Sequence, residues 1–463
     1  MSASMTTARV RRLSLVAGAA AVGLVLAGCG GDSGDGGGDG GGGGEESYEI
    51  DCAPYEEFGD IDGKTVSVYS SIAELEGEAQ ERSYDPFEEC TGVTIDYEGS
   101  REFEAQMLVR LQAGNPPDIA YLPQPGLLNT IVNDYPDAIV PAPPQTVANV
   151  DEFWSESWKM YGTVNDTFYA APLGANVKSF IWYSPSAFED GGYEVPETWT
   201  DLMALSDQMA SDVGAPVWCA GVESGDATGW PGTDFIEDVV LRTAGPDVYD
   251  QWYKHEIPFN APEIVEAWNT AGEVLKNPEL VNAGLGGVDS IATTPWTDAG
   301  FGLLDGTCLL HRAANFYAAN WPEGTDVSED GEVFAFYFPT DQTDIKPVLV
   351  GGEFVAAFDD RPEVQAFQTY LASADWANAK AVATPEGGWV SANTGLDPEL
   401  LNSELDQLSA EILADPEAVA RFDASDLMPG EVGAGTFWTG IVNWLTGEST
   451  QQVVDQIENS WPQ

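Results

Sequence analysis

The chain of 463 residues is poor in histidine and in positive charge. It has two histidines, His255 and His311, and 17 Lys and Arg against 77 Asp and Glu, which gives a formal net charge of −60. The two histidines lie far apart, and neither an H-E-x-x-H nor a C-x-x-C motif occurs. We therefore expect no metal and no cofactor. A protein of this charge repels nucleic acid and anionic lipid surfaces, so neither is expected as a partner.

The usual serine hydrolase motif is also missing. In GVESG, residues 221–225, Glu223 stands where a G-x-S-x-G nucleophile elbow has its serine. A secreted glycoside hydrolase would instead use a pair of carboxylates. Among 77 acidic residues such a pair cannot be recognised by counting, so this class stays open as an alternative.

Long apolar runs are missing too, apart from one near the start. Arg9, Arg11 and Arg12 precede an apolar run of small residues, which is typical of an export signal over residues 1–28. The run has roughly 16 residues, whereas a membrane-spanning helix needs about 20. Its end, LAGC, resembles a bacterial lipobox, which implies cleavage before Cys29 and lipid on that cysteine. An ordinary secretory cleavage that leaves a spare thiol is the alternative.

A Gly-rich tether follows the lipobox over residues 29–47, and a segment of this composition behaves as a random coil. We expect the protein to be exported and held at the outer face of the cytoplasmic membrane by the lipid on Cys29 alone. The other four cysteines are an even number in an exported chain, which predicts two disulfides from three possible pairings. They are Cys52, Cys90, Cys219 and Cys308.

The first part of the folded region predicts alternating strands and helices. The pattern indicates strands over residues 65–70, 93–97 and 118–122, a helix over 74–89 and a helix capped by Ser100. This order predicts a parallel sheet with right-handed crossovers. In it, Cys52 lies at the beginning of the first strand and Cys90 ends the helix that returns to the same edge. We therefore pair Cys52 with Cys90 and, by elimination, Cys219 with Cys308.

Polar side chains gather where these three strands end. Ligands of open parallel sheets bind outside the carboxyl ends of the strands. The residues at these ends are Ser70, Glu74, Ser100, Arg101 and Gln124. Ser100 also fits a plain helix N-cap, and Arg101 also fits a surface salt bridge.

Several segments resemble one family. Residues 81–128, with F-E-x-x-T-G-V-x-I followed by A-G-x-x-P-D-I, resemble the extracellular solute-binding proteins that serve carbohydrate ABC importers. Residues 169–183 are similar to the segment where such chains cross to their second lobe. Residues 217–246 resemble the branch that captures α-glucosides, and residues 428–438 (MPGEVGAGTFW) resemble its closing helices.

The resemblance implies an α/β chain with a type II-like, two-lobed periplasmic-binding-protein fold and a hinge between the lobes. The implied lobe boundaries are 48–173 and 313–371 for the first lobe, and 174–312 and 372–463 for the second. It further implies a monomer that is not an enzyme. This monomer captures an α-glucoside or oligosaccharide and delivers it to the transmembrane subunits of an ABC permease. A sugar-binding receptor that is not coupled to import is a further alternative.

A sugar offers apolar faces and a rim of hydroxyls, so its site combines aromatic plates with fixed polar groups. Trp230, Trp389 and Trp438 lie beside glycines and are candidate plates, although core packing explains each of them as well. By resemblance, Ser70, Glu74 and Gln124 belong to the ligand loops. The remaining candidates are Asp234, which could accept from two hydroxyls, and Arg312, Phe316, Gly352 and Glu353. A bulge or turn also explains the glycine at 352.

The lipid anchor gives a direct prediction. Replacement of Cys29 by serine removes the acylated sulfur, so Cys29→Ser is expected to move the protein from the membrane fraction to the soluble fraction. Fractionation followed by immunoblotting measures this. Retention of the variant in the membrane fraction would contradict lipidation.

The acidic composition gives a second prediction. Salt screens repulsion between surface carboxylates, so the melting temperature is expected to rise from low to molar NaCl. Differential scanning calorimetry measures this. A melting temperature that does not change over that range would show that self-repulsion does not limit stability.

Overall fold

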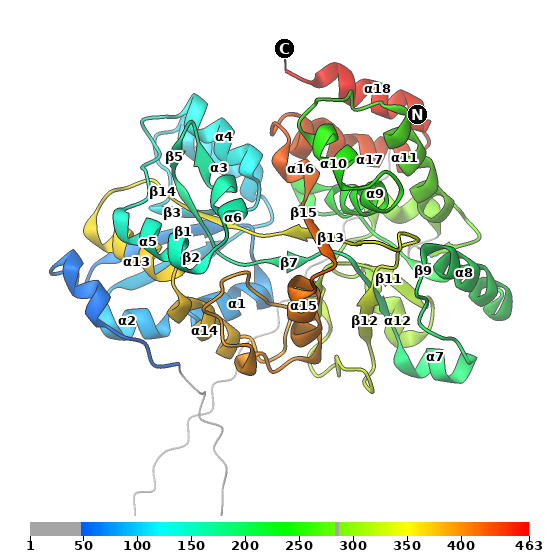
Figure 1. The fold of residues 1–463 in the computed structure, drawn as a ribbon, viewed down its shortest axis with the longest axis horizontal. Coiled ribbons are helices and arrows are strands. Elements are labelled where there is room, and N and C mark those ends of the chain that lie inside the picture. The colour runs from blue at the N-terminus through cyan, green and yellow to red at the C-terminus, as the bar shows by residue number, and fades with distance from the viewer. Residues whose placement is uncertain (1–47, 283–286, 463) are drawn as a thin grey trace, which may run out of the picture. The chain divides into compact units, whose positions relative to one another are not determined.

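The computed structural model describes residues 48–282 and 287–462, whose strands form two five-stranded sheets, a three-stranded sheet and a two-stranded one (Figure 1). The first sheet has the order β2-β1-β3-β14-β6. Its strands are β1 (Thr65–Ser70), β2 (Thr94–Gly99), β3 (Ile119–Leu122), β6 (Ala170–Pro172) and β14 (Phe354–Ala357). β1 is parallel to β2 and β3, which confirms the predicted parallel arrangement of the first three strands.

Helices that pack on the first sheet form, together with it, the first lobe. They are α1 (Glu74–Arg82), α2 (Asp85–Thr91), α3 (Phe103–Gln112), α4 (Pro125–Asp134), α5 (Pro144–Phe153), α6 (Glu156–Tyr161), α13 (Pro362–Leu371) and α14 (Ala374–Val382). The two-stranded sheet of β4 (Thr163–Val164) and β5 (Thr167–Phe168) lies beside them.

Two predicted helix details in this lobe are wrong. The helix predicted over residues 74–89 is two helices, because Pro86 has no N–H to continue the bonding ladder across the break. Ser100 does not cap α3. That helix begins at Phe103 with Glu102 as its N-cap residue, while the Ser100 hydroxyl accepts a hydrogen bond from the Glu102 N–H at 3.2 Å.

The second sheet has the order β10-β9-β11-β8-β12 and forms the second lobe with its helices. Its strands are β8 (Phe180–Tyr183), β9 (Trp218–Cys219), β10 (Val281–Asn282), β11 (Leu310–Arg312) and β12 (Phe334–Tyr337). The helices are α7 (Pro185–Gly191), α8 (Trp199–Val213), α9 (Trp230–Thr243), α10 (Pro246–Tyr253), α11 (Pro262–Leu275), α12 (Gly302–Asp305), α17 (Trp438–Leu445) and α18 (Thr450–Ser460).

A three-stranded bridging sheet connects the lobes. It consists of β7 (Asn176–Val177), β13 (Lys346–Gly351) and β15 (Ala418–Phe422), in the order β15-β13-β7. The chain enters the second lobe through β7, returns to the first through β13, and leaves it again through α15 (Glu404–Ala414), β15 and α16 (Ala424–Leu427). Figure 1 shows β7 and β13 extended between the two bodies.

The structure corrects part of the predicted domain division. Residues 313–371 were expected in the first lobe, but β12 pairs with β8 of the second sheet. Residues 372–463 were expected in the second lobe, but Trp376 of α14 is buried in the core of the first. Both errors have one cause, namely that strand pairing and side-chain packing, rather than chain order, decide where a segment folds. The other boundaries remain predictions.

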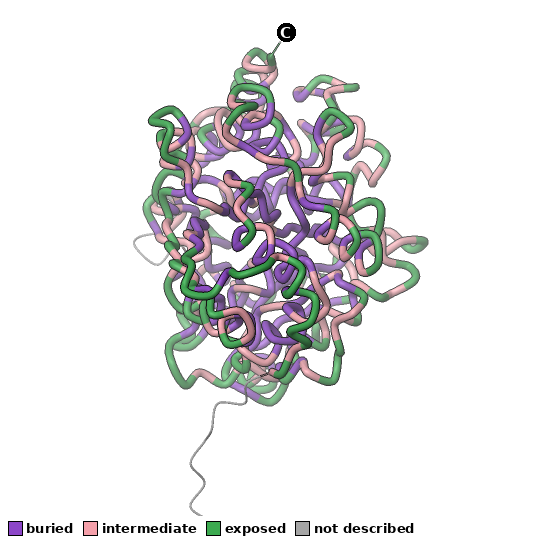
Figure 2. Tube along the Cα trace, turned by 90° about the vertical axis from the view of Figure 1, so that its left-hand side faces the viewer, coloured by how far each residue is buried: buried purple, intermediate pink, exposed green. Residues whose placement is uncertain are grey.

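Buried residues lie inside the fold and exposed ones at its rim (Figure 2), and each lobe has aromatic residues in its core. In the second lobe, the rings of Trp268 and Trp444 are both fully buried and meet edge to face, with centroids 5.1 Å apart. In the first, Phe87 stacks on Tyr370 at 5.2 Å. Large buried rings supply much apolar area at few positions, which suits lobes made of short strands.

Both predicted disulfides are confirmed. Cys52 and Cys90 have Cα atoms 5.4 Å apart, and Cys219 and Cys308 have theirs 5.6 Å apart. The predicted signal, tether and lipidated Cys29 lie outside the described residues. Within the described ranges, no helix has the length and apolar character needed to cross a bilayer.

Candidate functional site

Both lobes and the bridging sheet contribute to one cavity of about 910 Å³. Sites for small molecules in proteins span about 300–1,000 Å³. A second cavity of about 310 Å³ adjoins the first and shares Glu74, Glu76 and Arg101 with it. The first cavity is the candidate site.

An aromatic cluster forms the second-lobe wall of this cavity. Trp230, Trp296 and Phe316 are partly exposed, and their rings lie 5.1 to 6.0 Å apart. Trp438 also lines the cavity, but its ring is 4 % exposed. Across the cavity, Trp389 packs edge to face on Trp376 of the first lobe at 5.6 Å. Partly exposed faces of this kind can cover the apolar side of a ligand ring.

Trp230 owes its position to the glycine before it. Gly229 has a φ of 118°, and a Cβ atom there would lie 2.3 Å from the carbonyl oxygen of Trp438. Only glycine allows both this backbone conformation and this approach. The first turn of α9 therefore rests against the beginning of α17, which places the two tryptophans in one wall.

The beginning of α1, directly after the loop that follows β1, presents Glu74 to the cavity. Glu74 has a φ of 57°, a left-handed conformation that is unfavourable for a side chain with a Cβ and that clusters at functional sites. Its carboxylate forms an exposed ion pair with Arg101 at 2.8 Å. Ser70 is fully buried beneath the loop, where its hydroxyl accepts a hydrogen bond from the Ile72 N–H at 3.0 Å. Ser70 thus holds the loop while Glu74 lines the cavity.

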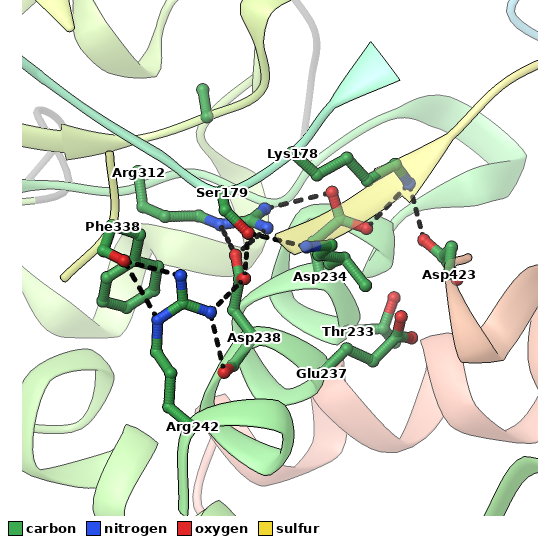
Figure 3. Close-up of polar contacts among 12 residues, drawn as sticks. Lys178, Ser179, Thr233, Asp234, Glu237, Asp238, Arg242, Arg312, Phe338 and Asp423 are labelled. Carbon is green, nitrogen blue, oxygen red and sulfur yellow. Dashed lines mark hydrogen bonds and ion pairs between the residues drawn. The ribbon is translucent and has the colours of Figure 1, made fainter. Parts of the chain in front are cut away.

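A chain of buried ion pairs runs from the cavity into the second lobe (Figure 3). The Lys178 ammonium, which lines the cavity, contacts the Asp423 carboxylate at 2.5 Å and the Asp234 carboxylate at 3.1 Å. Asp234 also binds Arg312 at 3.0 Å.

The chain of ion pairs continues from Arg312 to Asp238 at 2.5 Å and from Asp238 to Arg242 at 2.7 Å. The guanidinium of Arg242 then donates to the Phe338 carbonyl at 2.6 Å. Each of these ionic side chains is at most 8 % exposed. Their charges are therefore satisfied by each other rather than by water.

The ion pairs set the charges at the cavity end of this chain. Burial alone would lower the pKa of Lys178, but the Asp234 and Asp423 carboxylates raise it well above its usual value. Burial alone would raise the pKa of Asp423, yet the Lys178 ammonium holds it well below its usual range. The neighbouring Asp426 has the opposite shift, since burial and the Asp423 charge raise its pKa well above the usual value.

A second cluster of ionisable residues lies in the first-lobe wall of the cavity. Burial, and next the charge of Glu353, raises the pKa of Glu76 to about 7. Burial also raises the pKa of Glu353, and it lowers the pKa of Lys380 to about 7. All three residues line the cavity. This wall therefore offers both hydrogen-bond donors and acceptors, and the charges of Glu76 and Lys380 change near neutral pH.

Most of the predicted site residues are brought together in the cavity wall. Those that line it are Glu74, Arg101, Gln124, Trp230, Phe316, Gly352, Glu353, Trp389 and Trp438. Arg101 also forms the surface ion pair that was its alternative role. Their contact with a ligand remains a prediction.

Four predicted residues do not line the cavity. Asp234 and Arg312 are buried in the ion-pair chain, where both carboxylate oxygens of Asp234 already have partners. Ser70 supports the loop from below. Ser100 is bonded to the Glu102 N–H.

Sequence reasoning missed Lys178, Trp296, Asp423, Asp426 and Glu104, all of which line the cavity. Lys178 did carry a signal, since it interrupts the apolar segment VKSFIWY in a chain with few basic residues. A lysine in such a strand requires buried carboxylate partners. Nothing local distinguishes Asp423 or Asp426 from the other acidic residues.

An α/β chain of two lobes with a ligand-sized cavity between them has the architecture of a binding protein. A family model described as bacterial extracellular solute-binding protein matches residues 69–378. The chain belongs to this family, which confirms the resemblance drawn from its motifs.

Two relatives are similar along most of their length. The osmoprotective compounds-binding protein GgtB of Synechocystis sp. is 39 % identical over 408 residues, which cover 87 % of this chain and 94 % of the relative. The alpha-glucosides-binding periplasmic protein AglE of Rhizobium meliloti is 36 % identical over 437 residues, which cover 90 % and 92 % of the two chains.

A solved structure supports the fold. The bacterial solute receptor AcbH, described as having an exclusive preference for β-D-galactopyranose, has a TM-score of 0.70 to this chain at 18 % identity. The likeness covers 86 % of this chain and 98 % of that one. It confirms the predicted two-lobed periplasmic-binding-protein fold and, at this identity, shows the fold alone.

The ion-pair chain predicts a large loss of stability when its cavity end is removed. Lys178→Met removes the ammonium that pairs with the Asp234 and Asp423 carboxylates. Removing one partner of a buried ion pair lowers the free energy of unfolding by about 3–5 kcal/mol. Urea unfolding followed by circular dichroism measures the free energy of unfolding. Lys159→Met is the control, because its pair with Asp151 is at the surface, where such pairs contribute up to about 1 kcal/mol. Equal effects of the two variants would contradict the role of the network.

Proposed function

We propose that this protein captures an α-glucoside or a related oligosaccharide outside the cell and delivers it to an ABC permease. The observation that carries the proposal is the combination of aromatic rings and ionisable polar groups around one cavity between two lobes. The partly exposed rings of Trp230, Trp296 and Phe316 suit the apolar faces of a pyranose. The carboxylates of Glu74 and Glu353 suit its hydroxyls.

The family and the relatives support the same function. AglE is described as binding alpha-glucosides and GgtB as binding osmoprotective compounds, and both align with nearly the whole chain. A family of extracellular binding proteins fits an exported chain that is anchored through Cys29. Delivery to a permease is part of the proposal, because a binding protein outside the cell needs a second protein to carry the ligand across the membrane.

Closure of the lobes is part of the proposal. The chain passes between the lobes through the strands of the bridging sheet, so a small change in these strands can turn one lobe against the other. A sugar held by rings of the second lobe and carboxylates of the first would stabilise the closed arrangement.

A ligand titration tests the function. The folded body from Glu45 onward is titrated with maltose, trehalose, sucrose, cellobiose and a non-sugar control, with tryptophan fluorescence as the signal and product analysis of the same samples. Saturable binding of α-linked sugars without cleavage is expected. Cleavage would assign the protein to the glycoside hydrolases, and absence of binding to any sugar would refute the substrate class.

A single substitution tests the position of the site. Trp230→Ala removes a partly exposed ring from the cavity wall and is expected to weaken sugar binding at least about tenfold, or about 1.4 kcal/mol, by calorimetry. Trp461→Ala is the control, because that ring stacks on His255 and does not line the cavity. Trp438 is the poorer choice, since its ring is buried and its loss would also weaken packing. Unchanged affinity in Trp230→Ala would show that the ligand binds elsewhere.

A further inference from the structure

Asp426 is a buried carboxylate in the cavity wall that lacks hydrogen-bond donors. It is 8 % exposed. Its nearest cation, the Lys178 ammonium, lies 4.0 Å away and is held by Asp423 at 2.5 Å. Among the described residues, no side chain or backbone group donates a hydrogen bond to the Asp426 carboxylate. By contrast, Asp423 accepts from Lys178, from the Ser425 hydroxyl at 2.7 Å and from the Asp426 N–H at 3.0 Å.

Glu104 supplies a second incomplete carboxylate, from the other lobe. It lies in the first turn of α3, and its Oε1 atom accepts a hydrogen bond from the Gln124 amide at 3.1 Å. No other side chain of the described part of the chain donates to this carboxylate. Both residues line the cavity, while the Oε1 atom of Gln124 is buried without a partner beside them.

The lobes meet where these carboxylates lie. α4 of the first lobe contacts α16 of the second, and a Cβ atom at Gly126 would lie 2.0 Å from the Met428 carbonyl oxygen and 3.1 Å from that of Asp426. The charge of Glu104 is one of the causes that raise the pKa of Asp426, so the two carboxylates are close enough to interact. Like charges that face each other across a contact oppose it.

We infer that Asp426 and Glu104 are ligand-binding residues that accept hydrogen bonds from hydroxyl groups of one sugar and thereby join the two lobes. A buried carboxylate without donors is costly in the free protein. A polyhydroxylated ligand supplies these donors and brings no negative charge between the two acids. An anionic ligand would add to the repulsion, whereas a sugar removes the penalty. The inference rests on the proposed function and extends it to residues that the motifs did not indicate.

The free protein provides the first test. Asp426→Asn keeps the shape of the side chain but removes the acid whose ionisation burial opposes, so the melting temperature of the ligand-free protein is expected to rise. A structural role for the carboxylate predicts the opposite, because the variant would then lose a stabilising contact. Glu431→Gln, an exposed residue outside the cavity, is the control and is expected to leave the melting temperature unchanged. A lower melting temperature of Asp426→Asn would overturn the inference for that residue.

Ligand affinity provides the second test. Calorimetry with the sugar that binds best is expected to show at least a tenfold loss in Asp426→Asn and in Glu104→Gln, and no loss in the exposed control Glu102→Gln. Affinities of both site variants within twofold of the unchanged protein would overturn the inference. If the unchanged protein binds no sugar, the proposed function fails and this inference fails with it, whereas sugar binding that both site variants retain overturns the inference alone.

Deoxy sugars separate direct contact from indirect effects. If Asp426 accepts a hydrogen bond from one hydroxyl, the sugar lacking that hydroxyl binds the unchanged protein more weakly than the parent sugar does. Asp426→Asn then binds this deoxy sugar and the parent sugar with equal affinity. If every derivative loses affinity by the same factor in both proteins, Asp426 does not contact the sugar.

Discussion

The buried ammonium of Lys178 is the interaction on which the rest of the site depends. Lys178 follows β7, the first strand between the lobes, and its partners come from α9 and from the residue after β15. The Lys178 charge therefore connects the first segment that passes between the lobes with the last one. Removing ions from water is costly, so these segments are stable only when all of them are in place. The network through Asp234, Arg312 and Asp238 makes the second lobe a fixed support for the cavity.

The two lobes contribute different chemistry to the cavity. The second lobe provides the ring cluster of Trp230, Trp296 and Phe316, whose mutual contacts fix the direction of each ring. The first lobe provides Glu74, in the strained first position of α1, together with Glu76, Glu353 and Lys380. A ligand that satisfies only one wall would leave the other exposed to water. The two walls together suit a ligand with both an apolar face and a rim of hydroxyls, as proposed above.

The sequence predicted the fold better than it predicted the site. The strands β1, β2 and β3, their parallel pairing and both disulfides follow from local alternation, helix patterns and chain order. Loops at strand ends and tryptophans beside glycines led to Glu74 and Trp230, because position in the topology is enough to bring them to the cavity. Asp234 was misplaced because its distance from Trp230 in the sequence does not reveal which face of α9 is buried. Asp423 and Asp426 could not be recognised, since only tertiary packing separates them from the surface carboxylates.

The acidic composition has different consequences at the surface and in the cavity. At the surface, water and salt solvate carboxylates at little cost. In the cavity, burial raises the pKa of Glu76, Glu353 and Asp426, so keeping these groups ionised at neutral pH requires free energy. Because the pKa of each group is higher in the folded protein than in the unfolded chain, each group destabilises the folded protein more as the pH rises. A ligand that donates hydrogen bonds to the ionised groups offsets this cost, so part of the binding free energy comes from a penalty already present in the empty protein. The same carboxylates that weaken the free protein at neutral pH thus give a neutral, hydroxyl-rich ligand its advantage over an anion.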